Sequence, residues 1–118
     1  MTDINKQIED VINSSNVVLF MKGTPEMPQC GFSMVAVNIL KHYKIDFKSF
    51  DVYSDENIRQ GIKKYSNWPT IPQIYVNKEF IGGSDILKEM FEKKELEKFF
   101  IDKGCLLYTS PSPRDPTK

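Results

Sequence analysis

One cysteine beside a loop rich in glycine and proline is the residue of this chain with the clearest potential for chemistry. Cys30 follows the apolar run Val17–Met21 and precedes apolar residues at helical spacing, so we expect it where a strand leads into the start of a helix. The N–H groups of a first helical turn lack intrahelical partners, and the helix dipole adds partial positive charge there. Both effects favour the thiolate, which is the nucleophilic and metal-binding form of cysteine.

The motif that contains this cysteine lacks a second thiol. Cys30-Gly31-Phe32-Ser33 has the spacing of a Cys-x-x-Cys redox pair, but serine occupies its last position. Cys30 therefore has no local partner for a disulfide and must use an external thiol or a metal. A buried structural cysteine is the alternative, which a position at a helix start after a Gly/Pro-rich loop disfavours.

Two cationic residues are candidates for binding an anion. Lys22 comes directly after the apolar run 17–21, and Arg59 lies on a predicted helix with Ile58 and Ile62 on its inner face. Taken singly, each is equally well explained as a solvated side chain. Only together do Lys22 and Arg59 indicate an anion site.

Two further segments could present backbone groups to a ligand. A cis peptide bond in Thr70-Ile71-Pro72 would expose the Ile71 N–H and C=O to an extended ligand, although only about 5–6% of X–Pro bonds are cis, so the local sequence favours trans. Gly83-Ser84-Asp85 opens a predicted helix. Its free N–H groups and the Ser84 hydroxyl could bind a carboxylate and Asp85 an ammonium, with simple N-capping by Ser84 as the competing explanation.

The elements that position these residues follow from the apolar spacing. We predict helices over Ile4 to Ile12, after Cys30, after an N-cap at Ser54 that is followed by the acidic Asp55 and Glu56, after Gly83, and around Leu96 to Phe100. The stripe of the second helix is Phe32, Val35, Ala36, Ile39, Leu40 and Tyr43, and we expect it to cover a sheet. Strands are predicted at 17–21 and 46–52, parallel because a helix connects them, and in a hairpin over 74–81 that turns at Asn77-Lys78. The order predicts an α/β protein with a mixed sheet and helices on both sides.

Composition excludes several function classes. The chain has 118 residues, of which 40% are hydrophobic and 27% charged, as in a single globular domain. The chain has 16 basic and 16 acidic residues, so it has no excess of positive charge that would attract nucleic acid. No run approaches the roughly 18–20 apolar residues of a membrane span, so we expect no membrane association. Two cysteines are too few for a disulfide framework, which favours a reducing compartment, the cytosol or an organelle matrix.

The end of the chain differs in character from the rest. Residues 104–118 hold three prolines and show no periodicity. We predict a domain over 1–103 followed by a disordered tail that resembles vector-derived or misread sequence. Cys105 lies in this tail and is therefore left out of the site. His42, the single histidine, is left out because we expect it at the surface.

The motifs, in this order and spacing, resemble those of a known family. They are Met21-Lys22-Gly23-Thr24-Pro25, Met27-Pro28-Gln29, Cys30-Gly31-Phe32-Ser33, Trp68-Pro69-Thr70-Ile71-Pro72-Gln73 and Gly82-Gly83-Ser84-Asp85. Residues 1 to about 103 thus resemble the monothiol glutaredoxins of the Cys-Gly-Phe-Ser class. The resemblance implies a thioredoxin-like fold with a central four-stranded mixed sheet and an additional N-terminal helix. It also implies a glutathione site and the transfer of [2Fe-2S] clusters more than disulfide reduction.

The same resemblance implies a role for each site residue. Lys22 and Arg59 would bind the glycine carboxylate of glutathione, and Ile71, before a cis Pro72, would pair with the tripeptide backbone. Ser84 and Asp85 would bind the γ-glutamyl end, and Cys30 would be the catalytic thiol and the iron ligand. The implied cofactor-binding set is Lys22, Cys30, Phe32, Arg59, Thr70, Ile71, Pro72, Gly83, Ser84 and Asp85. Many relatives have cysteine where this chain has Ser84. Because serine has no thiol, an internal disulfide between this position and Cys30 is ruled out here.

Counting thiolates leads to an expected assembly. A [2Fe-2S] cluster takes four thiolates, and Cys30 supplies one. Two chains and two glutathiones supply four, so we expect a cluster-bridged homodimer, with BolA-like proteins and apo iron–sulfur acceptors as the further partners that the family implies. The alternative is an enzyme in which Cys30 removes glutathione from mixed disulfides, since a monothiol route needs no second cysteine. A regulatory protein that binds a partner through a shared cluster is a third possibility.

Overall fold

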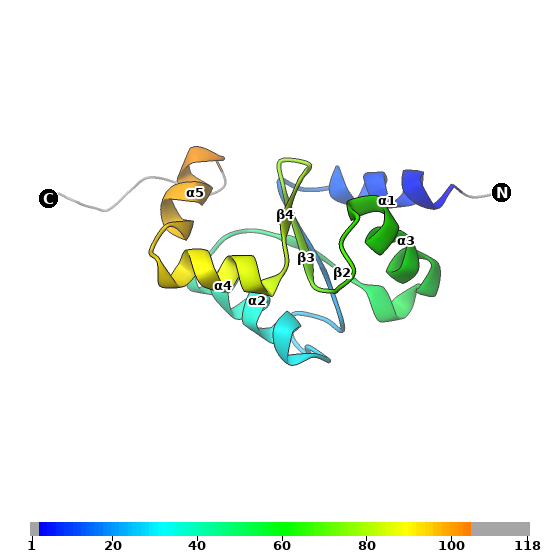
Figure 1. The fold of residues 1–118 in the computed structure, drawn as a ribbon, viewed down its shortest axis with the longest axis horizontal. Helices are drawn as coiled ribbons and strands as arrows, with labels where there is room; N and C mark the ends of the chain where they lie inside the picture. The colour runs from blue at the N-terminus through cyan, green and yellow to red at the C-terminus, as the bar shows by residue number, and fades with distance from the viewer. Residues whose placement is uncertain (1–2, 105–118) are drawn as a thin grey trace, which may run out of the picture.

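Four strands form one mixed sheet at the centre of the molecule (Figure 1). The computed structural model describes residues 3–104 of the chain. The strands are β1 (Val17–Met21), β2 (Lys48–Asp51), β3 (Gln73–Val76) and β4 (Glu79–Gly82), in the spatial order β2-β1-β3-β4. Strand β1 pairs parallel with β2 and antiparallel with β3, and β3 pairs antiparallel with β4. The mixed α/β architecture predicted from the sequence is confirmed.

Helices cover both faces of this sheet. They are α1 (Ile4–Ile12), α2 (Gly31–His42), α3 (Glu56–Ser66), α4 (Ser84–Glu92) and α5 (Leu96–Asp102), with a short 3-10 helix η1 (Val52–Ser54) after β2. Figure 1 shows α1 and α3 on one side of the strands and α2, α4 and α5 on the other. The predicted N-terminal helix is α1, and it packs against α3.

The central strand β1 explains why the core has two halves. All five of its residues are buried, because both faces of the strand are covered by helices. Alternate side chains point to opposite faces, so Val17, Leu19 and Met21 join the cluster under α2, α4 and α5. Val18 and Phe20 join the cluster under α1 and α3. The strand ends at Met21, between these two layers, and leads directly into the loop before Cys30.

Several local predictions need correction. Val52, expected at the end of a strand, begins η1. The N-cap of α3 is Asp55 instead of Ser54, because the Asp55 carboxylate accepts from the N–H groups of Asn57 and Ile58. The N-cap of α4 is Gly83, and Ser84 is the first helical residue with no capping hydrogen bond.

The apolar stripe of α2 also differs in one position. Phe32 is 62% exposed and does not cover the sheet, because the first turn of α2 turns Ser33 inward instead. Val35 and Tyr43 pack against the core as predicted, around the buried Ala36, Ile39 and Leu40.

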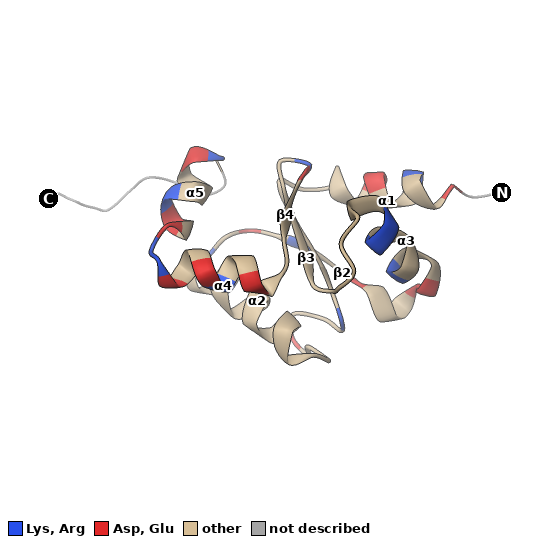
Figure 2. Ribbon diagram, viewed as in Figure 1, with Lys and Arg blue, Asp and Glu red and all other residues tan. Residues whose placement is uncertain are grey.

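Charged side chains of both signs are spread over the helices, while β1 and β3 carry none (Figure 2). Within residues 3–104, no helix combines the length and apolar character that crossing a bilayer requires. The predicted tail and Cys105 lie outside the described residues, apart from Gly104.

Candidate functional site

Cys30 stands at the N-terminus of α2, where the sequence predicted it. It is the N-cap residue, with φ −149° and ψ 137°, and its side chain makes no capping hydrogen bond. Its carbonyl accepts from the Met34 N–H at 3.0 Å, which begins the helix. Within residues 3–104 it is the one cysteine, and its side chain is half-exposed. The thiol is therefore accessible and has no second thiol from this part of the chain beside it.

Hydrogen bonds close the loop that leads to Cys30. The Gln29 N–H donates to the Lys22 carbonyl at 2.8 Å, and Thr24 and Met27 exchange backbone hydrogen bonds at 3.3 and 3.0 Å. The Gly23 N–H donates to Oδ1 of Asp51, at the end of β2, at 2.9 Å. The loop is thus anchored at its base and bridged across its middle, which restricts where Cys30 can lie.

Ser33 contributes to the same anchoring. It is fully buried, and its Oγ accepts from the Lys22 N–H at 3.1 Å. The residue that replaces the second cysteine of a redox pair therefore joins the first turn of α2 to the end of β1.

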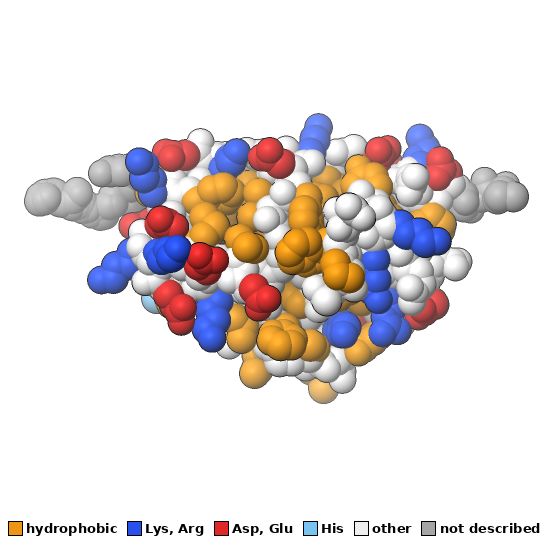
Figure 3. Space-filling model, viewed as in Figure 1, with side chains coloured by type: hydrophobic (Ala, Val, Ile, Leu, Met, Phe, Trp, Pro, Cys, Tyr) orange, Lys and Arg blue, Asp and Glu red, His pale blue; other side chains and the backbone are white. Residues whose placement is uncertain are grey.

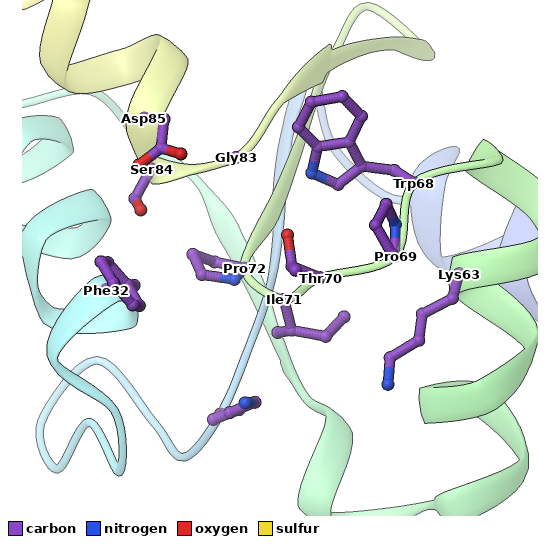
Figure 4. Close-up of a pocket in the computed structure, with 11 residues that line it drawn as sticks. Phe32, Lys63, Trp68, Pro69, Thr70, Ile71, Pro72, Gly83, Ser84 and Asp85 are labelled. Atoms are coloured by element: carbon purple, nitrogen blue, oxygen red, sulfur yellow. The ribbon is translucent and has the colours of Figure 1, made fainter.

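A pocket of about 400 Å³ lies beside this helix start, within the size range of small-molecule sites. The segment Trp68–Pro72 forms one part of its wall, and Lys22, Phe32, Lys63 and the first residues of α4 complete it (Figure 4). Of the expected binding residues, it brings together Lys22, Phe32, Thr70, Ile71, Pro72, Gly83, Ser84 and Asp85. Cys30 and Arg59 are not among the lining residues.

The start of α4 approaches the proline segment closely. The Ile71–Pro72 peptide bond is cis, the state that the family resemblance implied and the local sequence did not favour. A Cβ atom at Gly83 would lie 3.0 Å from the Pro72 carbonyl oxygen, so a larger residue would have to push the two segments slightly apart. Next to it, Ser84 is 6% exposed and Asp85 is exposed at the mouth of the pocket. A ligand lying along Ile71 would therefore reach the first turn of α4.

The Arg59 side chain contacts Glu56 and Tyr53 and does not line the pocket. Its Nη1 donates to Glu56 Oε1 at 3.4 Å, and its guanidinium lies over the Tyr53 ring, 5.4 Å from the centroid. The pKa of the Glu56 carboxyl is lowered, first by the hydrogen bond from Gln60 and further by the Arg59 charge. On α3, the cation that lines the pocket is Lys63, one helical turn further along the helix.

Sequence reasoning therefore missed three lining residues: Lys63, Trp68 and Pro69. The last two stood in a motif that was recognised, but no role was assigned to them. Figure 4 shows Lys63 extending from α3 on the side of the pocket opposite to Phe32. The only sequence signal for Lys63 is its spacing of four residues from Arg59, which places both on one side of the helix.

The surface around Cys30 is apolar. Met27, Phe32 and Met34 are exposed to 67%, 62% and 49% and lie within four residues of Cys30 in sequence. Figure 3 shows hydrophobic side chains across the middle of the viewed face and near its lower edge, between charged side chains of both signs. Exposed apolar side chains such as Met27, Phe32 and Met34 suit a surface that other molecules contact.

The described residues do not hold a metal site of their own. Within 3–104, no group of three or more His, Cys, Asp or Glu side chains could hold a metal ion. The half-exposed Cys30, free of hydrogen bonds from its side chain, fits a metal centre only if other molecules supply the remaining ligands.

Comparison with known proteins agrees with this geometry. Residues 17–81 match the glutaredoxin family. Glutaredoxin 3 of Danio rerio is 52% identical over 98 residues, covering 83% of this chain, which spans only 30% of that longer protein. The mitochondrial monothiol glutaredoxin-5 of Saccharomyces cerevisiae is 47% identical over 120 residues, covering 99% of this chain and 78% of that protein.

The fold agrees as well. The solution structure of a monomeric truncated mutant of Trypanosoma brucei 1-C-Grx1 superposes with a TM-score of 0.77 at 40% identity, covering 88% of this chain and 94% of that one. The fold is the thioredoxin-like fold of glutaredoxins, as expected from the resemblance. The chain belongs to the glutaredoxin family, and within it to the monothiol glutaredoxins of the Cys-Gly-Phe-Ser class.

Proposed function

We propose that this protein binds a [2Fe-2S] cluster, together with glutathione, between two copies of the chain and passes it to apo iron–sulfur proteins. The observation that carries this proposal is the environment of Cys30. The thiol is half-exposed at a helix N-terminus, and the serine at position 33 is buried and used as a backbone anchor. A cluster needs four thiolates. Residues 3–104 supply one accessible thiol, Cys30, so a cluster held by Cys30 requires a second chain and two further thiols.

The pocket supplies a reason for those further thiols to be glutathione. Figure 4 shows Lys63 on one side of the pocket and the first turn of α4, with Ser84 and Asp85, on the other, and Lys22 is a second cation of the lining. Between them lies Ile71, whose backbone can pair with an extended peptide. A tripeptide with a carboxylate at one end and an α-amino acid group at the other matches this order of charges. Its thiol would then lie toward Cys30, two residues before the lining residue Phe32.

Anaerobic reconstitution tests the proposal directly. Protein incubated with iron, sulfide and glutathione should develop visible absorbance and become a dimer with one cluster per two chains, and omitting glutathione should prevent both. Cys30→Ser should abolish cluster binding because it removes the protein ligand, whereas the matched control Cys105→Ser should retain it. A cluster of equal stability in Cys30→Ser would contradict the assignment.

The accessibility of Cys30 also favours a second candidate function, glutathione-dependent reduction of mixed disulfides. The Cys30 thiolate would attack the glutathionyl sulfur of a protein–glutathione disulfide, forming a Cys30–glutathione disulfide and releasing the protein thiolate. The thiolate of a second glutathione would then attack this disulfide, giving oxidised glutathione and free Cys30. A glutathione-coupled turnover assay distinguishes the two functions, since a pure cluster carrier should turn over far more slowly than dithiol relatives.

The partners and the compartment are part of this proposal. We propose that acceptors dock on the apolar surface around Cys30, and that BolA-like proteins are among the partners. The cytosol or an organelle matrix remains the predicted compartment. Pull-down with cluster-loaded and cluster-free protein separates partners that need the cluster from partners that do not.

A further inference from the structure

A buried glutamine stands directly behind the pocket. Gln73 is the first residue of β3 and is fully buried. Within residues 3–104, the buried polar residues are Ser33, Gln73 and Ser84, and the other two belong to the site described above. A buried polar side chain costs free energy unless it is hydrogen-bonded. Oε1 of Gln73 is buried without a hydrogen-bond partner among the described residues, so the two partners of its Nε2 are what hold the side chain.

Both partners are carbonyl groups of the segment that lines the pocket. The Gln73 side-chain amide donates from Nε2 to the Trp68 carbonyl at 3.2 Å and to the Thr70 carbonyl at 3.1 Å. This segment has few donors of its own, because Pro69 and Pro72 have no N–H. The orientation of the amide follows from these contacts, since carbonyl oxygens only accept and the NH₂ group must face them.

Gln73 itself does not line the pocket, but the residues that it holds do. Trp68, Thr70 and the intervening Pro69 form one part of the pocket wall, and Figure 4 shows them following one another along the loop toward Ile71 and Pro72. A displacement of this loop would move the Ile71 backbone, which is the group available to pair with an extended ligand. Gln73 can therefore influence ligand binding without touching the ligand.

We propose that Gln73 is a positioning residue that sets the affinity for glutathione by tying the Trp68–Thr70 loop to β3. The inference rests on the glutathione site of the proposed function. An apolar residue of similar size would fill the same volume but leave both carbonyls without their donor. The loop would then be free to adopt other conformations, and the ligand would have to order it on binding.

The chain contains one tryptophan, Trp68, so its fluorescence reports on this loop directly. Titrating the protein with reduced glutathione and following Trp68 emission gives the dissociation constant. For Gln73→Leu we expect a dissociation constant about tenfold higher than for the unsubstituted protein. For Gln73→Asn, whose amide is one methylene shorter and reaches at most one carbonyl, we expect about threefold. In both variants the Trp68 emission of the ligand-free protein should also shift.

Ile74→Val is the matched control. Ile74 is the next residue of β3 and is fully buried, but it belongs to the cluster on the opposite face of the sheet. This variant should lose some thermal stability yet keep the affinity and the Trp68 emission, which separates loop positioning from general destabilisation. Affinities of both Gln73 variants within twofold of the unsubstituted protein would overturn the inference, and Gln73→Asn alone decides if Gln73→Leu does not fold. If the unsubstituted protein does not bind glutathione, the proposed glutathione site fails and this inference fails with it.

Discussion

Two cations on α3, one helical turn apart, have different surroundings. Arg59 contacts Glu56 and the Tyr53 ring, whereas Lys63 lines the pocket together with Lys22. The family resemblance implied that Arg59 binds the glycine carboxylate of glutathione. In this geometry, Lys63 lines the pocket and makes only a charge interaction with Glu56, whereas Arg59 would have to leave its hydrogen bond to Glu56.

We therefore predict that Lys63→Gln weakens glutathione binding by about two- to fivefold, as loss of one partly exposed charge pair would. The neighbouring exposed Lys64, which does not line the pocket, provides a control with the same change of net charge. Lys64→Gln should alter the affinity little. Isothermal titration with glutathione at low and high salt measures both variants, and the difference between them should shrink as salt rises.

Arg59→Gln completes this comparison. If Arg59 stays with Glu56 and Tyr53, its removal should weaken binding less than removal of Lys63. A larger loss for Arg59→Gln than for Lys63→Gln would show that Arg59 turns into the pocket when the ligand binds.

Most pocket residues could be predicted because they belong to short contiguous motifs. Thr70-Ile71-Pro72 and Gly83-Ser84-Asp85 carry recognisable backbone chemistry, and the structure brings both segments to one pocket. Lys63 could not be predicted in this way. It stands on a helix with several charged residues, and the choice among them depends on how α3 packs on the sheet, which the local pattern does not contain. The supporting role of Gln73 was hidden for the same reason, because its partners become visible only in three dimensions.

At the scale of elements, the loop between β1 and α2 depends on one glycine. Gly23 has φ +91°, and a Cβ atom there would lie 2.5 Å from the Met27 carbonyl oxygen and 2.7 Å from the Gln29 nitrogen. These are backbone atoms of the same closed loop, so they cannot move aside without opening it. The glycine therefore allows the tight loop that carries Cys30 to the helix start.

We predict that Gly23→Ala destabilises the protein by about 2 kcal/mol, from the positive φ and the backbone clash together. It should also reduce cluster binding, because Cys30 is displaced. The control is Gly31→Ala, where a Cβ atom would meet nothing within 4 Å and alanine favours the helix that begins there. Urea unfolding should show a clear loss for the first variant and no loss for the second. Equal stability of both variants would contradict this account of the loop.

The elements themselves were largely predictable, and the exceptions are local. The apolar run 17–21 predicts a strand that is buried on both faces, and the helical spacing of apolar residues in the neighbouring segments predicts the helices that cover it. The structure has this arrangement, with one core cluster on each face of the sheet. The N-caps were harder to predict, since Ser54 and Asp55 are both good capping residues, and only the geometry shows that the Asp55 carboxylate reaches the free N–H groups. At Gly83 the close approach of Pro72 favours glycine, which no pattern on α4 reveals.

At the scale of the whole molecule, the half of the core under α1 and α3 contains a buried tyrosine. Tyr75 is 2% exposed, and its ring packs against Phe20 and Phe80, with centroids 5.7 and 5.4 Å away. Burial raises the pKa of the Tyr75 hydroxyl far above its ordinary value. The pKa values of Tyr43 and Tyr65 are also raised, mainly by burial.

These shifts make the stability of the fold depend on pH in the alkaline range. Below about pH 10 tyrosine is neutral in both the folded and the unfolded chain, so the shifts have no effect. Above it, the unfolded chain ionises while Tyr75 in the folded chain does not, so the unfolded chain binds fewer protons. The free energy of unfolding should then fall with rising pH, by up to about 1.4 kcal/mol per pH unit for Tyr75. Tyr75→Phe keeps the ring packing and should flatten this fall. Urea unfolding between pH 7 and 11 measures the slopes, and an unchanged slope in Tyr75→Phe would mean that other groups cause the alkaline loss.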